Sequence, residues 1–212
     1  MHNGKKMTQN GFVTIIDYGM GNLHSVKNAL DHLGIPCRVS DSPEDIKAAD
    51  RLILPGVGAF PDAMAALKRN GLDKLIIKQC RNGKPLLGIC LGMQLLFDES
   101  LEFGVTRGLG LIEGRVVPID AHGLKIPHIG WNSLSINKKS PVIANLNDGA
   151  YVYFVHSFRA DTASDNVIAY THYGEDIPAV VGSCDLPVYG AQFHPEKSHD
   201  TGLSIISAFC AL

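Results

Sequence analysis

Short apolar runs alternate with stretches of helical periodicity through the first half of the chain. The apolar runs, which predict buried strands, lie at residues 12–16, 37–39, 51–54 and 85–89. Between them, apolar positions recur every three or four residues and predict helices at 25–33, from Ser42 onward, and at 61–69, 72–81 and 91–97. Strands that alternate with helices in this way predict βαβ units and a mostly parallel sheet.

The second half has a different pattern, with many β-rich runs separated by turn residues. These runs lie at residues 116–117, 126–134, 151–158, 167–170, 179–183 and 188–193, and residues 203–212 predict a final helix. We therefore expect an α/β fold with a central, mostly parallel sheet flanked by helices and an antiparallel β-rich C-terminal half. No linker or repeat interrupts the pattern, so we expect one domain over residues 12–212 behind an N-terminal tail at 1–11.

Composition narrows the class of protein. The chain has 212 residues, of which 45% are hydrophobic and 19% charged, below the roughly 25% charged residues of an average soluble protein, which excludes a disordered chain. The formal net charge of −2, without a basic block, argues against a nucleic-acid partner. No run approaches the roughly 18 apolar residues that span a bilayer, and the polar N-terminus lacks a secretory core, so we expect a cytoplasmic protein.

The cysteine pattern excludes two kinds of site. The five cysteines are odd in number and widely spaced, which argues against a disulfide framework and a cysteine-rich zinc site and favours a reducing compartment. His194 and His199 are too loosely spaced, without a second ligand pair, to predict a metal site. No phosphate-binding or dinucleotide-binding glycine motif is complete, so we expect neither a metal nor a cofactor.

One cysteine has the surroundings of a nucleophile. Gly88, Cys90 and Gly92 form a G-x-C-x-G pattern between an apolar strand and a helix, which is the cysteine form of a nucleophile elbow. A helix N-terminus favours the thiolate, and the amide of Leu91 would face a developing oxyanion. The alternative is a small buried apolar side chain, and that interpretation holds for the other four cysteines, which lack this context.

A base and its orienting group follow the last predicted strand. Pro195 favours an extended His194, and in an extended chain residues two apart face the same side. Glu196 can therefore accept a hydrogen bond from the imidazole of His194, which would exchange a proton with Cys90 and with a leaving amine. We predict Cys90, His194 and Glu196 as a catalytic triad.

These motifs resemble those of the class I, triad-type glutamine amidotransferases. The runs GICLGMQ at 88–94 and HPE at 194–196 are shared across that family. Within it, the chain resembles the glutaminase subunits of imidazole glycerol phosphate synthases through the runs DYGMGNL at 17–23, LPGVGAF at 54–60, IPHIGWN at 126–132, YFVHSF at 153–158 and HPEKS at 194–198. The resemblance extends from about Phe12 to the C-terminus and implies the class I amidotransferase fold.

The resemblance also implies a reaction and a partner. Glutamine would be hydrolysed to glutamate and ammonia through a thioester on Cys90. The ammonia would pass to a separate HisF-type (β/α)8-barrel cyclase in a heterodimer, which makes imidazole glycerol phosphate and the purine precursor AICAR in histidine biosynthesis.

Further residues gain roles from the same resemblance. It assigns the oxyanion hole to Val57, Gly58 and Leu91. It assigns glutamine binding to Gln94, His156, Ser157 and Phe158, although a histidine flanked by apolar strand residues is also often only packed. It assigns the contact with the cyclase to Tyr18, Gly19, Met20, Asn22 and Lys197. Phe158 departs from the family, where tyrosine is commoner.

Three other functions stay open from the sequence. A paralogous amidotransferase would carry the same triad and supply ammonia to a sugar-amidating partner in surface-polysaccharide synthesis. A silent binding subunit would have no need of an intact triad. A cysteine hydrolase acting on peptides or γ-glutamyl compounds would share the elbow.

Overall fold

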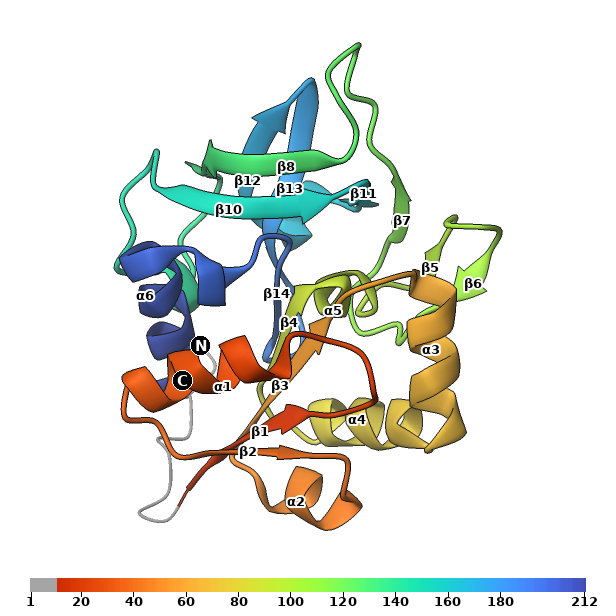
Figure 1. The fold of residues 1–212 in the computed structure, drawn as a ribbon, viewed down its shortest axis with the longest axis vertical. Helices are drawn as coiled ribbons and strands as arrows, with labels where there is room; N and C mark the ends of the chain where they lie inside the picture. The colour runs from red at the N-terminus through yellow and green to blue at the C-terminus, as the bar shows by residue number, and fades with distance from the viewer. Residues whose placement is uncertain (1–10) are drawn as a thin grey trace.

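The centre of the protein is an eight-stranded mixed sheet (Figure 1). The computed structural model describes residues 11–212, so the predicted tail falls almost entirely outside the described residues. Five neighbouring strands run parallel in the order β2 (Cys37–Ser40), β1 (Val13–Ile16), β3 (Arg51–Gly56), β4 (Leu86–Cys90) and β14 (Val188–Ala191). Antiparallel strands continue the sheet as β13 (Glu175–Gly182), β12 (Val167–Tyr173) and β9 (Ser135–Ile136). The predicted α/β class is confirmed.

Helices cover both faces of this sheet (Figure 1). One face packs against α1 (Leu23–His32) and α6 (His199–Cys210), and the other against α2 (Pro43–Ala48), α3 (Phe60–Arg69) and α4 (Leu72–Arg81). Within β3, Ile53 joins the core under α1 and α6, while Leu52 and Leu54 join the core on the other face. Burial on both faces explains why these strands are continuous apolar runs. Within residues 11–212, no helix combines the length and apolarity needed to cross a membrane.

Two small sheets lie beside the large one. The first pairs β8 (His128–Ser133) with β10 (Tyr151–His156), and Figure 1 shows this pair above α6. The second contains β11 (Phe158–Asp161), β7 (Arg115–Pro118), β5 (Glu99–Ser100) and β6 (Thr106–Arg107). The β-rich run at 151–158 divides between the two small sheets, because the chain breaks at Ser157 and Phe158 pairs with β7.

The helix after Cys90 is shorter than predicted. It extends over α5 (Leu91–Gln94) instead of residues 91–97. After Leu95 the chain leaves the α-helical pattern, because the amides of Leu96 and Phe97 donate three residues back, to Met93 and Gln94. The carbonyls of Leu95, Leu96 and Phe97 then accept hydrogen bonds from amides in the loop at 109–112. Single turns of 3₁₀ helix occur at η1 (Pro141–Ile143), η2 (Ser164–Asn166) and η3 (Pro195–Lys197).

Replacing Gly92 by alanine tests the close contact between α5 and β3. A Cβ at Gly92 would lie 1.8 Å from the carbonyl oxygen of Leu54, which is backbone and cannot move away cheaply. We expect Gly92→Ala to lower the free energy of unfolding by about 3 kcal/mol or more, measured by urea denaturation. Gly83→Ala is the control, because its position has positive φ but open space, and should cost only about 1–2 kcal/mol. Equal losses in the two variants would contradict the crowding.

Candidate active site

Cys90 lies at a sharp turn between β4 and α5. Its backbone has φ 54° and ψ −113°, a conformation that side-chain-bearing residues rarely adopt and that costs about 1–3 kcal/mol. The turn needs glycine on both sides: a Cβ at Gly88 would lie 2.5 Å from the carbonyl oxygen of Gly92, and one at Gly92 would strike Leu54. The thiol is 7% exposed, and its sulfur lies 3.8 Å from the carbonyl oxygen of Val155. The predicted elbow is therefore present as a backbone geometry.

The loop after β3 lies against this turn. Gly56 is the register partner of Cys90, and a Cβ on Gly56 would approach the amide of Gly92 within 2.8 Å. Val57 and Gly58 follow, with Val57 43% exposed and Gly58 at φ +100°. The structure thus brings Val57, Gly58 and Leu91, the predicted oxyanion-hole residues, to the same end of the sheet as the Cys90 thiol.

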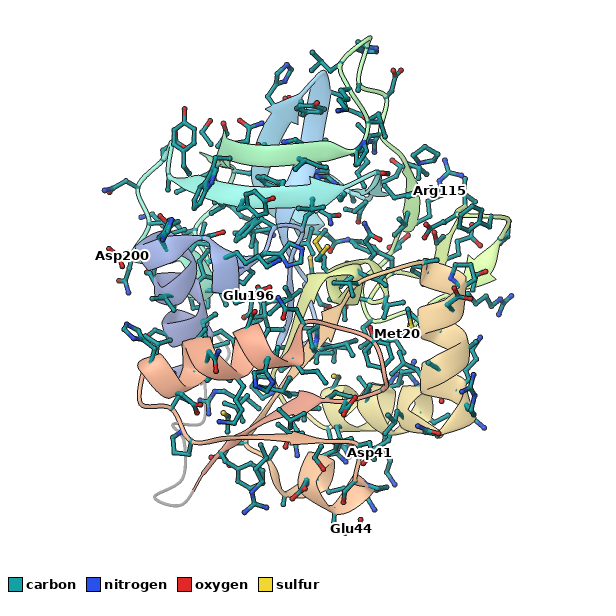
Figure 2. The ribbon with its side chains drawn as sticks, viewed as in Figure 1. Met20, Asp41, Glu44, Arg115, Glu196 and Asp200 are labelled. Carbon is teal, nitrogen blue, oxygen red and sulfur yellow. The ribbon has the colours of Figure 1, made fainter. Side chains whose placement is uncertain are left out.

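His194 and Glu196 meet in the turn that follows β14. The Nδ1 atom of His194 lies 2.9 Å from Oε1 of Glu196, and both side chains are buried. Figure 2 labels Glu196 near the middle of the molecule, beside α6 and below β10. The contact was predicted from an extended chain, but Pro195–Lys197 is a single 3₁₀ turn, so the geometric reason differs. His194 is tied to β10, because its amide donates to the carbonyl of Tyr153 at 3.0 Å.

The electrostatics of His194 favour its charged form. Burial is the largest single effect and lowers its pKa, but the hydrogen bonds and charges of Cys90 and Glu196 together outweigh it. The result raises the pKa of His194 to about 10, so the imidazole carries two protons at neutral pH. Since Cys90 contributes to this shift, its side chain lies beside the ring.

The predicted glutamine-binding residues also converge near Cys90. Gln94 is buried, and its Nε2 atom donates to the carbonyl of Phe158 at 3.0 Å. His156 ends β10, Ser157 forms the break, and Phe158 begins β11. His156 is buried and its Nδ1 lies 2.9 Å from the same Phe158 carbonyl, so it is more than a packed side chain.

Tyr18, one of the residues predicted to contact the cyclase, has a buried side chain. Its side chain is only 4% exposed, and its hydroxyl donates to the carbonyl of Pro55 at 3.0 Å. Burial, with a smaller effect of Cys90, raises the pKa of Tyr18 above its usual range, so the hydroxyl keeps its proton. This side chain supports the loop after β3 and offers no surface to a partner. Gly19 and Lys197 are exposed, while Met20 and Asn22 are half-buried.

An exposed apolar surface lies on the β8–β10 pair, and the sequence did not predict it. Ile129 is 57% exposed, Trp131 44% and Tyr151 60%. Trp131 stacks on His199 at 5.1 Å between ring centroids. In the sequence, the run at 126–132 contains Ile129 and Trp131, but nothing in its pattern shows which side chains are exposed. In the described part of the chain, no group of three or more histidine, cysteine or acidic side chains could hold a metal ion.

Known proteins are similar to this chain in sequence and in fold. A family model described as glutamine amidotransferase class-I matches residues 14–211. The HisH subunit of imidazole glycerol phosphate synthase from Bacillus velezensis is 50% identical over 203 residues, covering 93% of this chain and 94% of the relative. The same subunit from Methanosarcina barkeri is 49% identical over 197 residues, covering 93% and 96%. The solved structure of PurLQS from Thermotoga maritima has a similar fold, with a TM-score of 0.75 at 21% identity, covering 94% of this chain and 97% of that one.

The charge state of His194 can be tested by nitrogen-15 NMR of the imidazole. We expect doubly protonated His194 at pH 8, and a lower pKa in Glu196→Gln, because one of the contacts that raise it is lost. The folded pKa lies above the unfolded value of 6.5, so this group's contribution to stability is complete below pH 6.5 and is lost as pH rises toward about 10. Glu113→Gln, at an exposed position, is the control. A neutral His194 at pH 7 would contradict the assignment.

Proposed function

We propose a function from the premise that this chain belongs to the class-I glutamine amidotransferase family: it releases ammonia from glutamine as the glutaminase subunit of an imidazole glycerol phosphate synthase. The observation that carries the proposal is the position of Cys90 on a strained turn beside the buried His194–Glu196 pair. The identity of about half the residues with HisH subunits, over nearly the whole chain, supports the specific pathway.

The first half-reaction forms a thioester. The sulfur of Cys90 attacks the side-chain amide carbon of glutamine, and the carbonyl oxygen becomes an oxyanion. His194, already protonated, donates a proton to the leaving nitrogen as the carbon–nitrogen bond breaks. Ammonia leaves, a glutamyl thioester remains on Cys90, and His194 is neutral.

The second half-reaction hydrolyses the thioester. Neutral His194 takes a proton from water, and the resulting hydroxide equivalent attacks the thioester carbon. The carbon–sulfur bond breaks, glutamate leaves, and the Cys90 sulfur and the doubly protonated His194 are regenerated. Glu196 accepts from Nδ1 throughout, so it leaves Nε2 as the atom that exchanges protons.

Backbone amides stabilise the oxyanions and hold the substrate. We assign the oxyanion hole to Leu91 with Val57 or Gly58, since both loops approach Cys90. We assign the α-amino and α-carboxylate groups of glutamine to the break between β10 and β11, at His156, Ser157 and Phe158, together with Gln94. The contact of Gln94 with the Phe158 carbonyl supports this grouping.

The partner is a HisF-type (β/α)8-barrel cyclase, which uses the ammonia to make imidazole glycerol phosphate and AICAR. Exposed Ile129, Trp131 and Tyr151 form an apolar surface of the kind found at the centre of protein interfaces. Lys197 is exposed next to the triad and Gly19 is exposed on the loop before α1. We assign the interface to these exposed residues on the β8–β10 pair, on η3 and on the loop before α1. The buried side chain of Tyr18 is not part of it.

The loop before α1 connects the proposed interface to the oxyanion-hole residues, so the cyclase could control the glutaminase through it. Met20 lies on it (Figure 2), and its Cε would be 2.9 Å from a Cβ on Gly58. Tyr18, at its start, holds the carbonyl of Pro55. A partner seated on this loop would press on the oxyanion-hole residues, and the glycines on both sides of Val57 allow its peptide to reorient. We infer low glutaminase activity in the free subunit.

The site of action is the cytoplasm. The five cysteines are free in the structure, which suits a reducing compartment. The named relatives are imidazole glycerol phosphate synthase subunits, which favours histidine biosynthesis over a sugar-amidating pathway.

Replacing Cys90 by alanine separates the two reactions of the complex. We expect Cys90→Ala, with the cyclase and its nucleotide substrate, to lose glutamine-dependent turnover by more than about a thousandfold. Turnover with added ammonium salt should be unchanged, because ammonia then reaches the cyclase without the glutaminase. The measurement is product formation with each nitrogen source.

Cys184→Ala is the matched control, because Cys184 is exposed and lacks the elbow. It should keep both activities. Glutamine-dependent turnover by Cys90→Ala would refute the nucleophile. Wild-type glutamate release that ignores the cyclase and its nucleotide would leave the thiol chemistry in place and refute the partner.

A further inference from the structure

Two histidines face each other across the β8–β10 pair, behind the substrate-binding break. His128 and His156 are register partners, and their exposed fractions are 2% and 6%. Nδ1 of His128 lies 3.0 Å from Nε2 of His156. The reaction described above uses neither ring for proton transfer.

The hydrogen-bond partners fix the direction of every bond in this pair. A carbonyl oxygen only accepts, so Nδ1 of His156, 2.9 Å from the Phe158 carbonyl, must carry a hydrogen. A neutral imidazole has one N–H, so Nε2 of His156 is an acceptor. Nδ1 of His128 must therefore donate to it, which assigns the tautomer of both rings.

Burial keeps both rings neutral. It lowers the pKa of His128 and of His156 to about 4, and the nearby His194 further disfavours a charge on His156. At pH 7 each ring therefore has one donor and one acceptor, as the chain of hydrogen bonds requires.

The same carbonyl orients Gln94. Because Phe158 can only accept, the Gln94 atom 3.0 Å away must be the amide nitrogen. This nitrogen also donates to Oε1 of Gln192 at 3.1 Å, so both of its N–H groups have acceptors. The Oε1 atom of Gln94 is the part of the amide that can accept a hydrogen bond from the substrate. Because Oε1 of Gln192 points to Gln94, its Nε2 points elsewhere, and this buried nitrogen has no hydrogen-bond partner among residues 11–212.

Stacking holds His128 at the head of this chain of bonds. Its ring lies 4.8 Å from Phe154 and 4.0 Å from Tyr173, between centroids, with interplanar angles of 22° and 18°. Two nearly parallel neighbours leave the imidazole little freedom to rotate, so Nδ1 stays directed at His156.

We propose that His128 is a positioning residue for glutamine: by donating to Nε2 of His156 it pairs the one acceptor of that buried ring, and so holds His156, the Phe158 carbonyl and the Gln94 amide in the arrangement that receives the substrate. The inference rests on the proposed function, since it assigns the substrate to this break. It adds a residue that touches no substrate and acts through three successive hydrogen bonds.

Two variants separate donation from packing. His128→Phe keeps a ring for the stack with Phe154 and Tyr173 but removes the donor. His128→Asn places an amide N–H at the position of Nδ1, because the two atoms are equally far from the backbone along the side chain. His32→Phe, at an exposed position on α1, is the control for a histidine replacement.

We expect the KM for glutamine of the complex with the cyclase to rise about tenfold in His128→Phe, while kcat changes less than about threefold. A tenfold rise corresponds to about 1.4 kcal/mol, which is the size of effect expected when one buried acceptor loses its donor. His128→Asn should restore most of the KM, and His32→Phe should match the wild type. Nitrogen-15 NMR of the wild-type imidazoles should find both rings protonated on Nδ1, and in His128→Phe the Nε2 resonance of His156 should shift, because that atom loses its hydrogen-bond donor.

An unchanged KM in His128→Phe, or a wild-type His156 protonated on Nε2, would overturn the proposal. Equal defects in the phenylalanine and asparagine variants, with lowered thermal stability in both, would assign His128 to packing and also overturn it. The proposed function fails separately, if the wild-type complex releases no glutamate from glutamine.

Discussion

The strained backbone at Cys90 is the constraint on which the active site depends. A side-chain-bearing residue at φ 54° persists only where the surrounding structure holds it, and here Gly88 and Gly92 allow β3, β4 and α5 to approach closely enough to do so. The turn aims the thiol out of the end of the sheet, between Gly56 on one neighbouring strand and the chain that follows β14 on the other. The oxyanion-hole loop follows the first of these neighbours, and His194 and Glu196 follow the second.

Around this turn, the site is built from buried polar groups whose hydrogen bonds are directional. Glu196 fixes one nitrogen of His194, and Tyr18 fixes the carbonyl before Gly56. The Phe158 carbonyl collects two donors from different elements, Gln94 on α5 and His156 on β10. Because these bonds are directional, they hold the polar groups of the site in place before a substrate arrives.

The sequence predicted the parts of this arrangement that depend on local pattern. Apolar runs located the parallel strands, and the glycine spacing located the elbow at Cys90. Contacts between distant segments were not accessible in the same way. The loop at 109–112 donates hydrogen bonds to the residues that follow α5, and the hydroxyl of Tyr18 donates to the carbonyl of Pro55. The strands β5, β6 and β9 have two residues each, too few to show alternation. The pairing of His128 with His156 follows from the register of two strands that local pattern cannot align.

We propose that the elbow makes the sulfur of Cys90, among five cysteines, the atom that attacks glutamine. The most direct measurement is mass spectrometry of peptides from the complex, quenched in acid during turnover with glutamine, to locate the acyl group. The account predicts a glutamyl adduct on the peptide that contains Cys90 and none on the peptides of the other four. An adduct on another cysteine, or glutamate release without any adduct under conditions that preserve thioesters, would contradict it.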